Sequence, residues 1–196
     1  MSTFREFLHQ KRDALIERRA AAAANPEGQA PRQLAATVKA EGRSGVRRIR
    51  IRDHQILSDS GPELAGYDFG PGSPEIQVGV LGSCLTHIFE IQAAEREIWL
   101  DALEVEVHAI QDFRSGQPGF EDVPRWPHQV TYTVTIESDE PEERIRELHR
   151  AVEEVCPILN LLVNPQTITG SVTLNGRERV STLTKGPAEV VAVAAD

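Results

Sequence analysis

Cysteine is scarce in this sequence, with two residues among 196. Two cysteines cannot build the dense disulfide framework that stabilises many small secreted domains. Cys84 and Cys156 are therefore either small buried apolar side chains or a pair that is used chemically. The count alone favours the first interpretation.

Long apolar runs are absent as well. The longest, Ile76–Ile91, contains Gln77, His87 and Glu90 and is too short and too polar to span a bilayer. Residues 1–12 carry several charges and no apolar h-region, so no secretory signal is predicted. We therefore expect a cytoplasmic protein in a reducing compartment, with no membrane partner.

Positive charge is in deficit, and the formal net charge is −9. Nucleic-acid-binding proteins usually present a basic face, so no nucleic-acid partner is expected. The one dense group of arginines is predicted to be a solvated strand face: Arg43, Arg47, Arg48, Arg50 and Arg52. A chain of 196 residues can build one good core and is too short for two independent ones.

Hydrophobic periodicity predicts helices and strands in alternating groups. The helices are expected at 3–23, from 73 onward, and at 140–163, the last capped by Ser138 or Asp139. The strands are expected at 33–40, 46–52, 54–58, 102–110, 129–137 and 166–174. Residues 176–196 show no clear period and predict no element. This order of elements is typical of an α+β domain.

The central helix has the clearest starting signal. Ser73 is expected to cap it, Pro74 suits the first helical position, and Glu75 lies in the positive first turn. The run that follows is apolar on nearly all sides, which predicts a helix buried on most faces. Gly79 and Gly82 would let another backbone approach closely. Such a helix is more apolar than a small monomer needs.

Each cysteine has a distinctive setting. Cys84 lies in the middle of the apolar central helix, where the simplest interpretation is a packed small side chain. Cys156 directly precedes Pro157. If Pro157 opens a new helical segment, Cys156 caps it, and the free N–H groups there favour a thiolate. Otherwise the proline is only a helix break.

Several short motifs together resemble the OsmC/Ohr family of osmotically induced and organic-hydroperoxide-resistance proteins. They are Leu57-Ser-Asp59, Gly66-Tyr-Asp68-x-Gly70-Pro71, Pro74-Glu75, Leu81-Gly-Ser-Cys84-Leu and Glu154-Val-Cys156-Pro157. The resemblance runs from about residue 34 to 175. It divides the chain into an N-terminal helical extension and linker (1–32), an OsmC-like domain (33–175) and a C-terminal tail (176–196). Gly82-Ser-Cys84-Leu85 replaces the Ala-Ala-Cys-Phe of the Ohr and OsmC types, which indicates the OsmC-like branch.

The resemblance implies antiparallel sheets packed around a central buried helix in an intertwined homodimer. It also implies a peroxidase that uses neither metal nor cofactor. Cys84 would attack a hydroperoxide, such as an organic hydroperoxide, and the resulting sulfenic acid would condense with Cys156 to a disulfide. A dithiol, in this family typically a protein-bound dihydrolipoyl group, would restore both thiols. The alternative is a non-catalytic OsmC-like protein that binds a small hydrophobic ligand in the dimer cleft.

The family also uses an arginine to stabilise the thiolate and a glutamate to orient the arginine. Glu75 matches the glutamate by its place after Pro74. Arg43 matches the arginine best by its position in the turn between the first two strands, and Arg47 and Arg48 compete with it. Glu75 and Cys84 are nine residues apart on one expected helix, hence on opposite faces and about 13 Å apart along the axis. We therefore expect Glu75 to serve Cys84 of the other subunit.

Two features outside these motifs leave alternatives open. His87 lies three residues after Cys84, on the same helical face, and could pack or hydrogen-bond, tune the thiolate or, with further ligands, hold a metal. We take the first as the simplest interpretation, and no metal site is predicted. His149 is interpreted as an ordinary polar position. The helix at 3–23 presents an apolar stripe, which predicts docking on its own domain or on the partner subunit.

Overall fold

A computed structural model describes residues 3–176 and 178–186 of the chain. The helices are α1 (Phe4–Ala24), α2 (Ser73–Arg96), α3 (Glu142–Val155) and α4 (Pro157–Val163), with a short 3-10 turn at Pro62–Leu64. The strands are β1 (Thr37–Ala40), β2 (Arg47–Ile51), β3 (His54–Ser58), β4 (Ala102–Ile110), β5 (His128–Glu137), β6 (Ile168–Leu174) and β7 (Glu178–Lys185). The predicted α+β class is confirmed.

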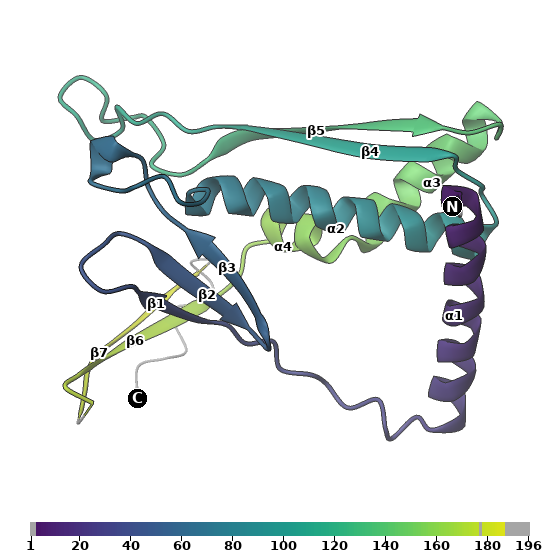
Figure 1. Ribbon diagram of the computed structural model, residues 1–196, viewed down its shortest axis with the longest axis horizontal. Coiled ribbons are helices and arrows are strands. Elements are labelled where there is room, and N and C mark those ends of the chain that lie inside the picture. The colour runs from purple at the N-terminus through teal and green to yellow at the C-terminus, as the bar shows by residue number, and fades with distance from the viewer. Residues whose placement is uncertain (1–2, 177, 187–196) are drawn as a thin grey trace.

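The strands form three antiparallel sheets, one of which packs along the long helix α2. Their orders are β1-β2-β3, β4-β5 and β6-β7. The β4–β5 hairpin runs along one side of α2, whereas α3 and α4 pack on the other side and α1 crosses near its C-terminal end (Figure 1). The sheet of β1–β3 and the β6–β7 hairpin lie toward the N-terminal end of α2 and extend away from this core (Figure 1). The predicted antiparallel sheets and central helix are thus confirmed, with one sheet packed on the helix within a single chain.

Helix α2 is buried against its own chain on only part of its surface. Leu81, Leu85 and Phe89 are almost fully buried in the core. A Cβ atom at Gly82 would lie 3.3 Å from the side chain of Val107, so this glycine permits the close approach of β4. Gly79 instead faces open space, and neighbouring Val80 is exposed. The prediction that α2 is buried on most sides is therefore not met within a single chain, which buries one face of the helix.

The start of α2 lies one residue earlier than the sequence predicts. Gly72 is the N-cap and Ser73 is already helical, so the expectation that Ser73 caps the helix is wrong. The Glu75 carboxylate accepts a hydrogen bond from the Gly72 N–H at 2.6 Å. This carboxylate satisfies the N–H of the N-cap residue from three residues downstream, which is the glutamate half of a capping box.

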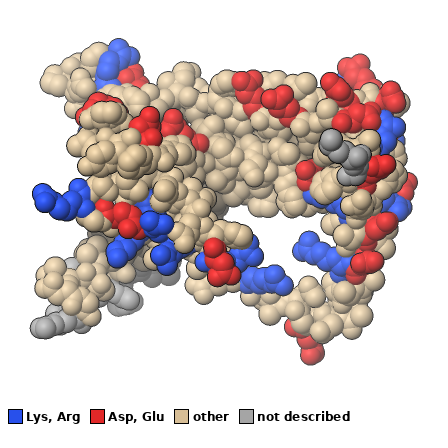
Figure 2. Space-filling view, in the orientation of Figure 1, with Lys and Arg blue, Asp and Glu red and all other residues tan. Residues whose placement is uncertain are grey.

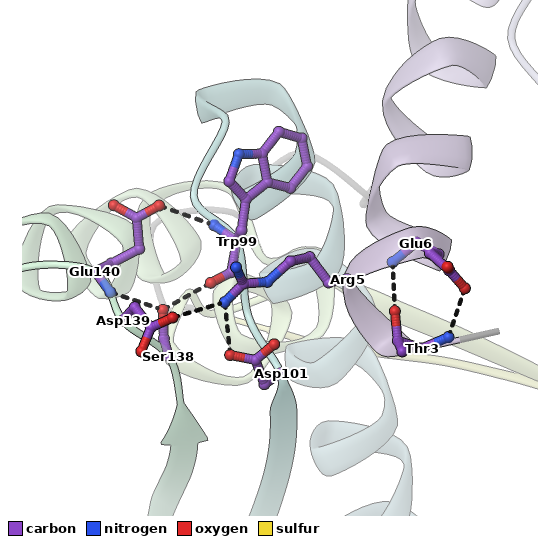
Figure 3. A network of polar contacts seen from close by, with 8 residues as sticks. All are labelled: Thr3, Arg5, Glu6, Trp99, Asp101, Ser138, Asp139 and Glu140. Carbon is purple, nitrogen blue, oxygen red and sulfur yellow. Dashed lines mark hydrogen bonds and ion pairs between the residues drawn. The ribbon is translucent and has the colours of Figure 1, made fainter.

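The turn between β5 and α3 also differs from its prediction. The N-cap of α3 is Pro141, and neither Ser138 nor Asp139 has this role. The Ser138 hydroxyl instead donates to the carbonyl of Trp99 at 2.7 Å and accepts from the N–H of Glu140 at 3.1 Å. Ser138 therefore ties this turn to the segment that leads from α2 into β4 (Figure 3).

Helix α1 docks on the core of its own chain, as one of the two predicted arrangements requires. Leu8 is fully buried, in one cluster with Leu148 and Phe89. Arg5 donates to Asp101 at 2.7 Å and to Asp139 at 3.4 Å, so it joins α1 to the starts of β4 and α3 (Figure 3). These contacts make α1 part of the core around α2.

Residues 178–185 form a strand that the sequence did not predict. The strand β7 pairs antiparallel with β6, with a register shift between Val172 and Thr173. It contains few strongly apolar residues, so its alternation is weak and the segment was assigned to the tail. The rest of that tail, 187–196, lies outside the described residues. Along the described chain, no helix is both long and apolar enough to cross a membrane.

Candidate functional site

The two cysteines meet although 72 residues separate them in the sequence. Their sulfur atoms lie 3.6 Å apart, and both are free thiols. Cys84 is partly exposed on α2, whereas Cys156 is fully buried. Within a single chain Cys84 is therefore the more exposed of the two residues, and the buried Cys156 sulfur contacts that of Cys84. A disulfide would require the sulfur atoms to close to about 2.05 Å.

Cys156 is held where α3 ends and α4 begins. Its backbone is extended, with φ −66° and ψ 114°, because the following Pro157 disfavours a helical conformation at this position. Its N–H still bonds to the carbonyl of Val152 at 2.9 Å, so it also closes α3. The predicted cap at Cys156 is confirmed. Asn160, which the sequence did not single out, reinforces the junction by donating to the carbonyl of Cys156 at 2.9 Å and to that of Glu153 at 3.1 Å.

Within one chain the surroundings of Cys84 disfavour its thiolate. Burial raises the pKa of the Cys84 thiol most, and the sulfur of Cys156 raises it further. The backbone N–H of Ile158, in the first turn of α4, lowers the pKa of Cys84 by donating to its sulfur. The net direction is upward, and no arginine of the described chain opposes it.

Glu75 and Cys84 share the uninterrupted helix α2, as the sequence predicted. Nine residues separate them, which corresponds to about 13 Å along the axis and to opposite faces. The carboxylate is occupied at the helix start by the N–H of Gly72. The structure therefore does not bring Glu75 to the thiol of its own chain.

The arginine cluster lies on β2 and on the turns before and after it. Figure 2 shows basic side chains gathered over this part of the molecule, with acidic ones between them. Arg47 donates to Ser58 at 3.0 Å and to the carbonyl of Asp59 at 2.8 Å. Arg48 donates to Glu41 and to Gln55, both at 2.7 Å.

Arg43 differs from its two neighbours. It is exposed in the turn between β1 and β2. No hydrogen bond or ion pair to it is found along residues 3–176 and 178–186. Of the three arginines proposed for the site, Arg43 is thus the one not already engaged within its own sheet.

Asp59, part of the first matching motif, organises the loop that leads to α2. It is fully buried, and its Oδ2 accepts from the N–H groups of Tyr67 at 2.9 Å and Phe69 at 3.3 Å. Burial raises the pKa of Asp59, but hydrogen bonds from the backbone of Ser60, Tyr67 and Phe69, together with the charge of Arg47, outweigh it and lower the pKa. Asp59 thus acts as a structural anion.

His87 contacts α1. Its Nδ1 lies 3.4 Å from Lys11 Nζ and 3.6 Å from the carboxylate of Glu90, and its side chain is exposed. This geometry corresponds to the hydrogen-bonding alternative. Among the described residues, no group of three or more His, Cys, Asp and Glu side chains is placed to hold a metal ion.

A polar group beside Cys156 was missed by the sequence analysis. His149, interpreted there as an ordinary polar position, lies 2.6 Å from the hydroxyl of Tyr132, and this hydroxyl also donates to Glu153 at 2.6 Å. The residues come from β5 and α3, so no local spacing could reveal the contact.

Solved structures place this arrangement in a known fold. An OsmC-like protein from Mycoplasma pneumoniae superposes with a TM-score of 0.55 at 18% identity, over 68% of this chain and 88% of that one. An osmotic stress induced and detoxification response protein from Psychrobacter arcticus gives 0.54 at 16%, over 68% and 90%. An organic hydroperoxide resistance protein from Legionella pneumophila gives 0.50 at 14%, over 69% and 93%. The class is therefore the OsmC-like α+β fold.

The profile of the OsmC-like protein family matches residues 66–171, more than half of the chain. The chain belongs to this family, and the resemblance seen in the sequence is confirmed. Among proteins of curated function, none matches the chain.

Proposed function

We propose that the protein is a thiol peroxidase in which Cys84 reacts with hydroperoxides and Cys156 resolves the product. The observation that carries the proposal is the 3.6 Å contact between a partly exposed and a fully buried sulfur. The thiolate of Cys84 attacks the peroxide, one oxygen goes to Cys84 as a sulfenic acid, and the alcohol leaves with a proton. Cys156 then displaces the hydroxyl from Cys84 as water, and a disulfide forms.

The asymmetry of the pair suits these two roles. The peroxidatic thiol must meet a solute, and Cys84 is the more exposed of the two residues. A resolving thiol needs access only to its partner, and a buried Cys156 is protected from direct oxidation. A dithiol such as a protein-bound dihydrolipoyl group would attack the exposed sulfur of the disulfide and return both cysteines to thiols.

Because the pKa of Cys84 is raised within a single chain, a further group must stabilise its thiolate. A peroxidase needs the thiolate, and a positive charge close to the sulfur is the usual means of producing it. We propose a homodimer in which Arg43 and Glu75 of one subunit act on Cys84 of the other. This proposal is supported by the unengaged Arg43, by the distance of Glu75 from its own Cys84, and by the open face of α2 at Gly79 and Val80.

The direct test is peroxide consumption by wild type, Cys84→Ser and Cys156→Ser proteins with excess dithiol. Cys84→Ser should be inactive. Without added dithiol, which would reduce a sulfenic acid directly, Cys156→Ser should consume about one equivalent of peroxide and accumulate oxidised Cys84, which a sulfenic-acid trap and mass spectrometry would detect. Equal multiple-turnover activity in wild type and Cys84→Ser would overturn the proposal.

The alternative, a non-catalytic protein that binds a small hydrophobic ligand in the dimer cleft, is favoured by one observation. The pKa of Cys84 is raised in the isolated chain, as suits an unreactive thiol. The hollow along α3 does not suit an apolar ligand, because Arg96, Glu147, Arg150 and Glu154 line it. A protein that does not consume peroxide yet binds an apolar fluorescent probe would establish this alternative.

A further inference from the structure

The sheet of β1–β3 has two faces of opposite character. Its first two strands pair so that Lys39 lies directly opposite Arg48, and Thr37 directly opposite Arg50. Because side chains alternate along a strand and paired residues share a face, these four side chains lie on the same side of the sheet. The opposite side carries the apolar residues Val38, Ile49, Ile51 and Ile56. One face of the sheet is therefore basic and the other apolar.

The basic face is hollowed. A cavity of about 400 Å³ is lined by Thr37, Lys39, Glu41, Arg48 and Arg50. This volume falls within the range of about 300–1,000 Å³ that is usual for small-molecule sites. Most such sites are lined by apolar side chains, whereas four of these five residues are charged. The cavity therefore suits a charged ligand.

The positive charge around this cavity is not balanced. Three cations, those of Lys39, Arg48 and Arg50, face the single carboxylate of Glu41. Like charges directly opposite one another across two strands destabilise their pairing, and Lys39 and Arg48 are such a pair. Hydrogen bonding from Arg48 lowers the pKa of Glu41 most, and the charges of all three cations lower it further against the opposing effect of burial. A ligand with two negative charges would restore the balance.

One of the three cations is held in place, and the other two are available. The guanidinium of Arg48 donates from Nε to Glu41 and from Nη1 to Gln55, both at 2.7 Å. These bonds fix the plane of the guanidinium and leave the N–H groups of Nη2 for a ligand. In the part of the chain that the structure describes, Lys39 and Arg50 make no hydrogen bond or ion pair. The cavity thus combines one preorganised guanidinium with two unengaged cations.

We propose that this cavity binds the phosphate group of a small phosphorylated molecule. A phosphate monoester carries about two negative charges at neutral pH, which is the charge that the cavity lacks. Guanidinium groups bind phosphate oxygens through paired N–H donors, and a lysine adds a point charge. The rest of the volume takes the organic part of the ligand. The inference does not depend on the proposed function, because none of the lining residues takes part in the proposed peroxidase chemistry.

Isothermal titration calorimetry of the full-length protein at low ionic strength tests the proposal. Glucose 6-phosphate is the probe, and inorganic phosphate and glucose are the comparisons. The variants are Lys39→Gln, Arg50→Gln and the control Arg52→Gln, which removes the same charge from the turn after β2, outside the cavity. Lys39 and Arg50 are exposed, so both variants should keep the fold, and their urea midpoints verify this.

Glucose 6-phosphate should bind wild type more tightly than inorganic phosphate does, and glucose should not bind. Lys39→Gln and Arg50→Gln should each weaken the binding of glucose 6-phosphate by about 10-fold or more, through the loss of a hydrogen bond to a charged group. Arg52→Gln should match wild type. Absence of binding to wild type, or equal binding by wild type and Arg50→Gln, would overturn the site. An equal loss in Arg52→Gln would also overturn it, because a diffuse positive field would then explain the binding.

Vesicles distinguish a soluble ligand from a lipid headgroup. Phosphatidic acid presents a phosphate monoester on a membrane surface, and a chain of net charge −9 should be repelled by such an anionic surface. Wild type should therefore stay in the supernatant when phosphatidylcholine vesicles containing phosphatidic acid are sedimented. Sedimentation of wild type but not of Arg50→Gln, without binding of glucose 6-phosphate, would assign the cavity to a lipid and overturn the small-molecule ligand.

Discussion

The guanidinium of Arg47 donates to the main-chain carbonyl of Asp59 across 2.8 Å and so ties β2 to the loop that leads into α2. The carboxylate of Asp59 fixes that loop in turn, through the N–H groups of Tyr67 and Phe69. A buried anion thereby sets the place where the cysteine-bearing helix starts. The stability that depends on this anion must vary with pH.

Asp59→Asn should destabilise the protein most near neutral pH. The pKa of Asp59 is lowered in the folded protein, so its contribution is fully present above the unfolded-state pKa of about 3.9 and is lost as the pH falls through the folded-state pKa. Urea denaturation at pH 7 and pH 3 measures the effect: the wild-type midpoint should exceed that of the variant at pH 7 and approach it at pH 3. Asp53→Asn, in the exposed turn after β2, is the control and should change the midpoint little. A constant difference for Asp59→Asn across this range would contradict the role of the charge.

Leu8→Ala should cost about 2–5 kcal/mol of unfolding free energy, because it leaves a cavity in the core around α2. Leu8 is 0% exposed, whereas Ile16 of the same helix is 49% exposed. Ile16→Ala, the matched control, should cost less than about 1 kcal/mol. Urea unfolding of both variants provides the comparison. Equal small losses would show that α1 contributes little to the fold.

A mixture of Glu75→Ala and Cys84→Ser subunits should recover peroxidase activity. If Glu75 serves the opposite subunit, each mixed dimer contains one site with both defects and one with neither. Activity is measured before and after subunit exchange, and native mass spectrometry verifies the exchange. No recovery after verified exchange would place both residues in one site or remove Glu75 from the mechanism.

Arg43→Gln should raise the pH at which Cys84 becomes reactive toward iodoacetamide. The single chain already holds the pKa of Cys84 above its ordinary value, so removal of the proposed counter-charge should move the midpoint up by about 1 pH unit or more. The rate of alkylation against pH, in a Cys156→Ser background, gives the midpoint. Arg52→Gln, in the turn after β2, should leave it in place. An unchanged midpoint in Arg43→Gln would remove Arg43 from the site.

The elements that the sequence located well are those with strong local patterns. The strand at 102–110 was predicted with its observed limits, because its apolar residues alternate without interruption. The break of the last helix at Cys156 was equally clear, since a proline acts on its immediate neighbour. The order of the elements and the motifs around the two cysteines were then enough to identify the family.

The features that the sequence did not reveal depend on contacts between distant segments. His87 has a spacing that points to Cys84, yet its polar partner is Lys11 of α1. Tyr132 and His149 lie 17 residues apart, on a strand and a helix whose packing no local pattern specifies. The strand β7 was missed because pairing with β6, rather than its own weak alternation, holds it in place.

The exposed stretch 25–36 between α1 and β1 has no regular secondary structure, and Figure 1 shows it running along the edge of the molecule from one to the other. Such a tether holds α1 near its docking surface at an effective concentration of the order of millimolar. A contact worth only about 4 kcal/mol is then enough to keep the helix bound for half of the time. Proteolytic cleavage within the tether would turn the contact into a bimolecular one. At micromolar protein concentration a contact of that strength would be lost, and Leu8 would leave the core.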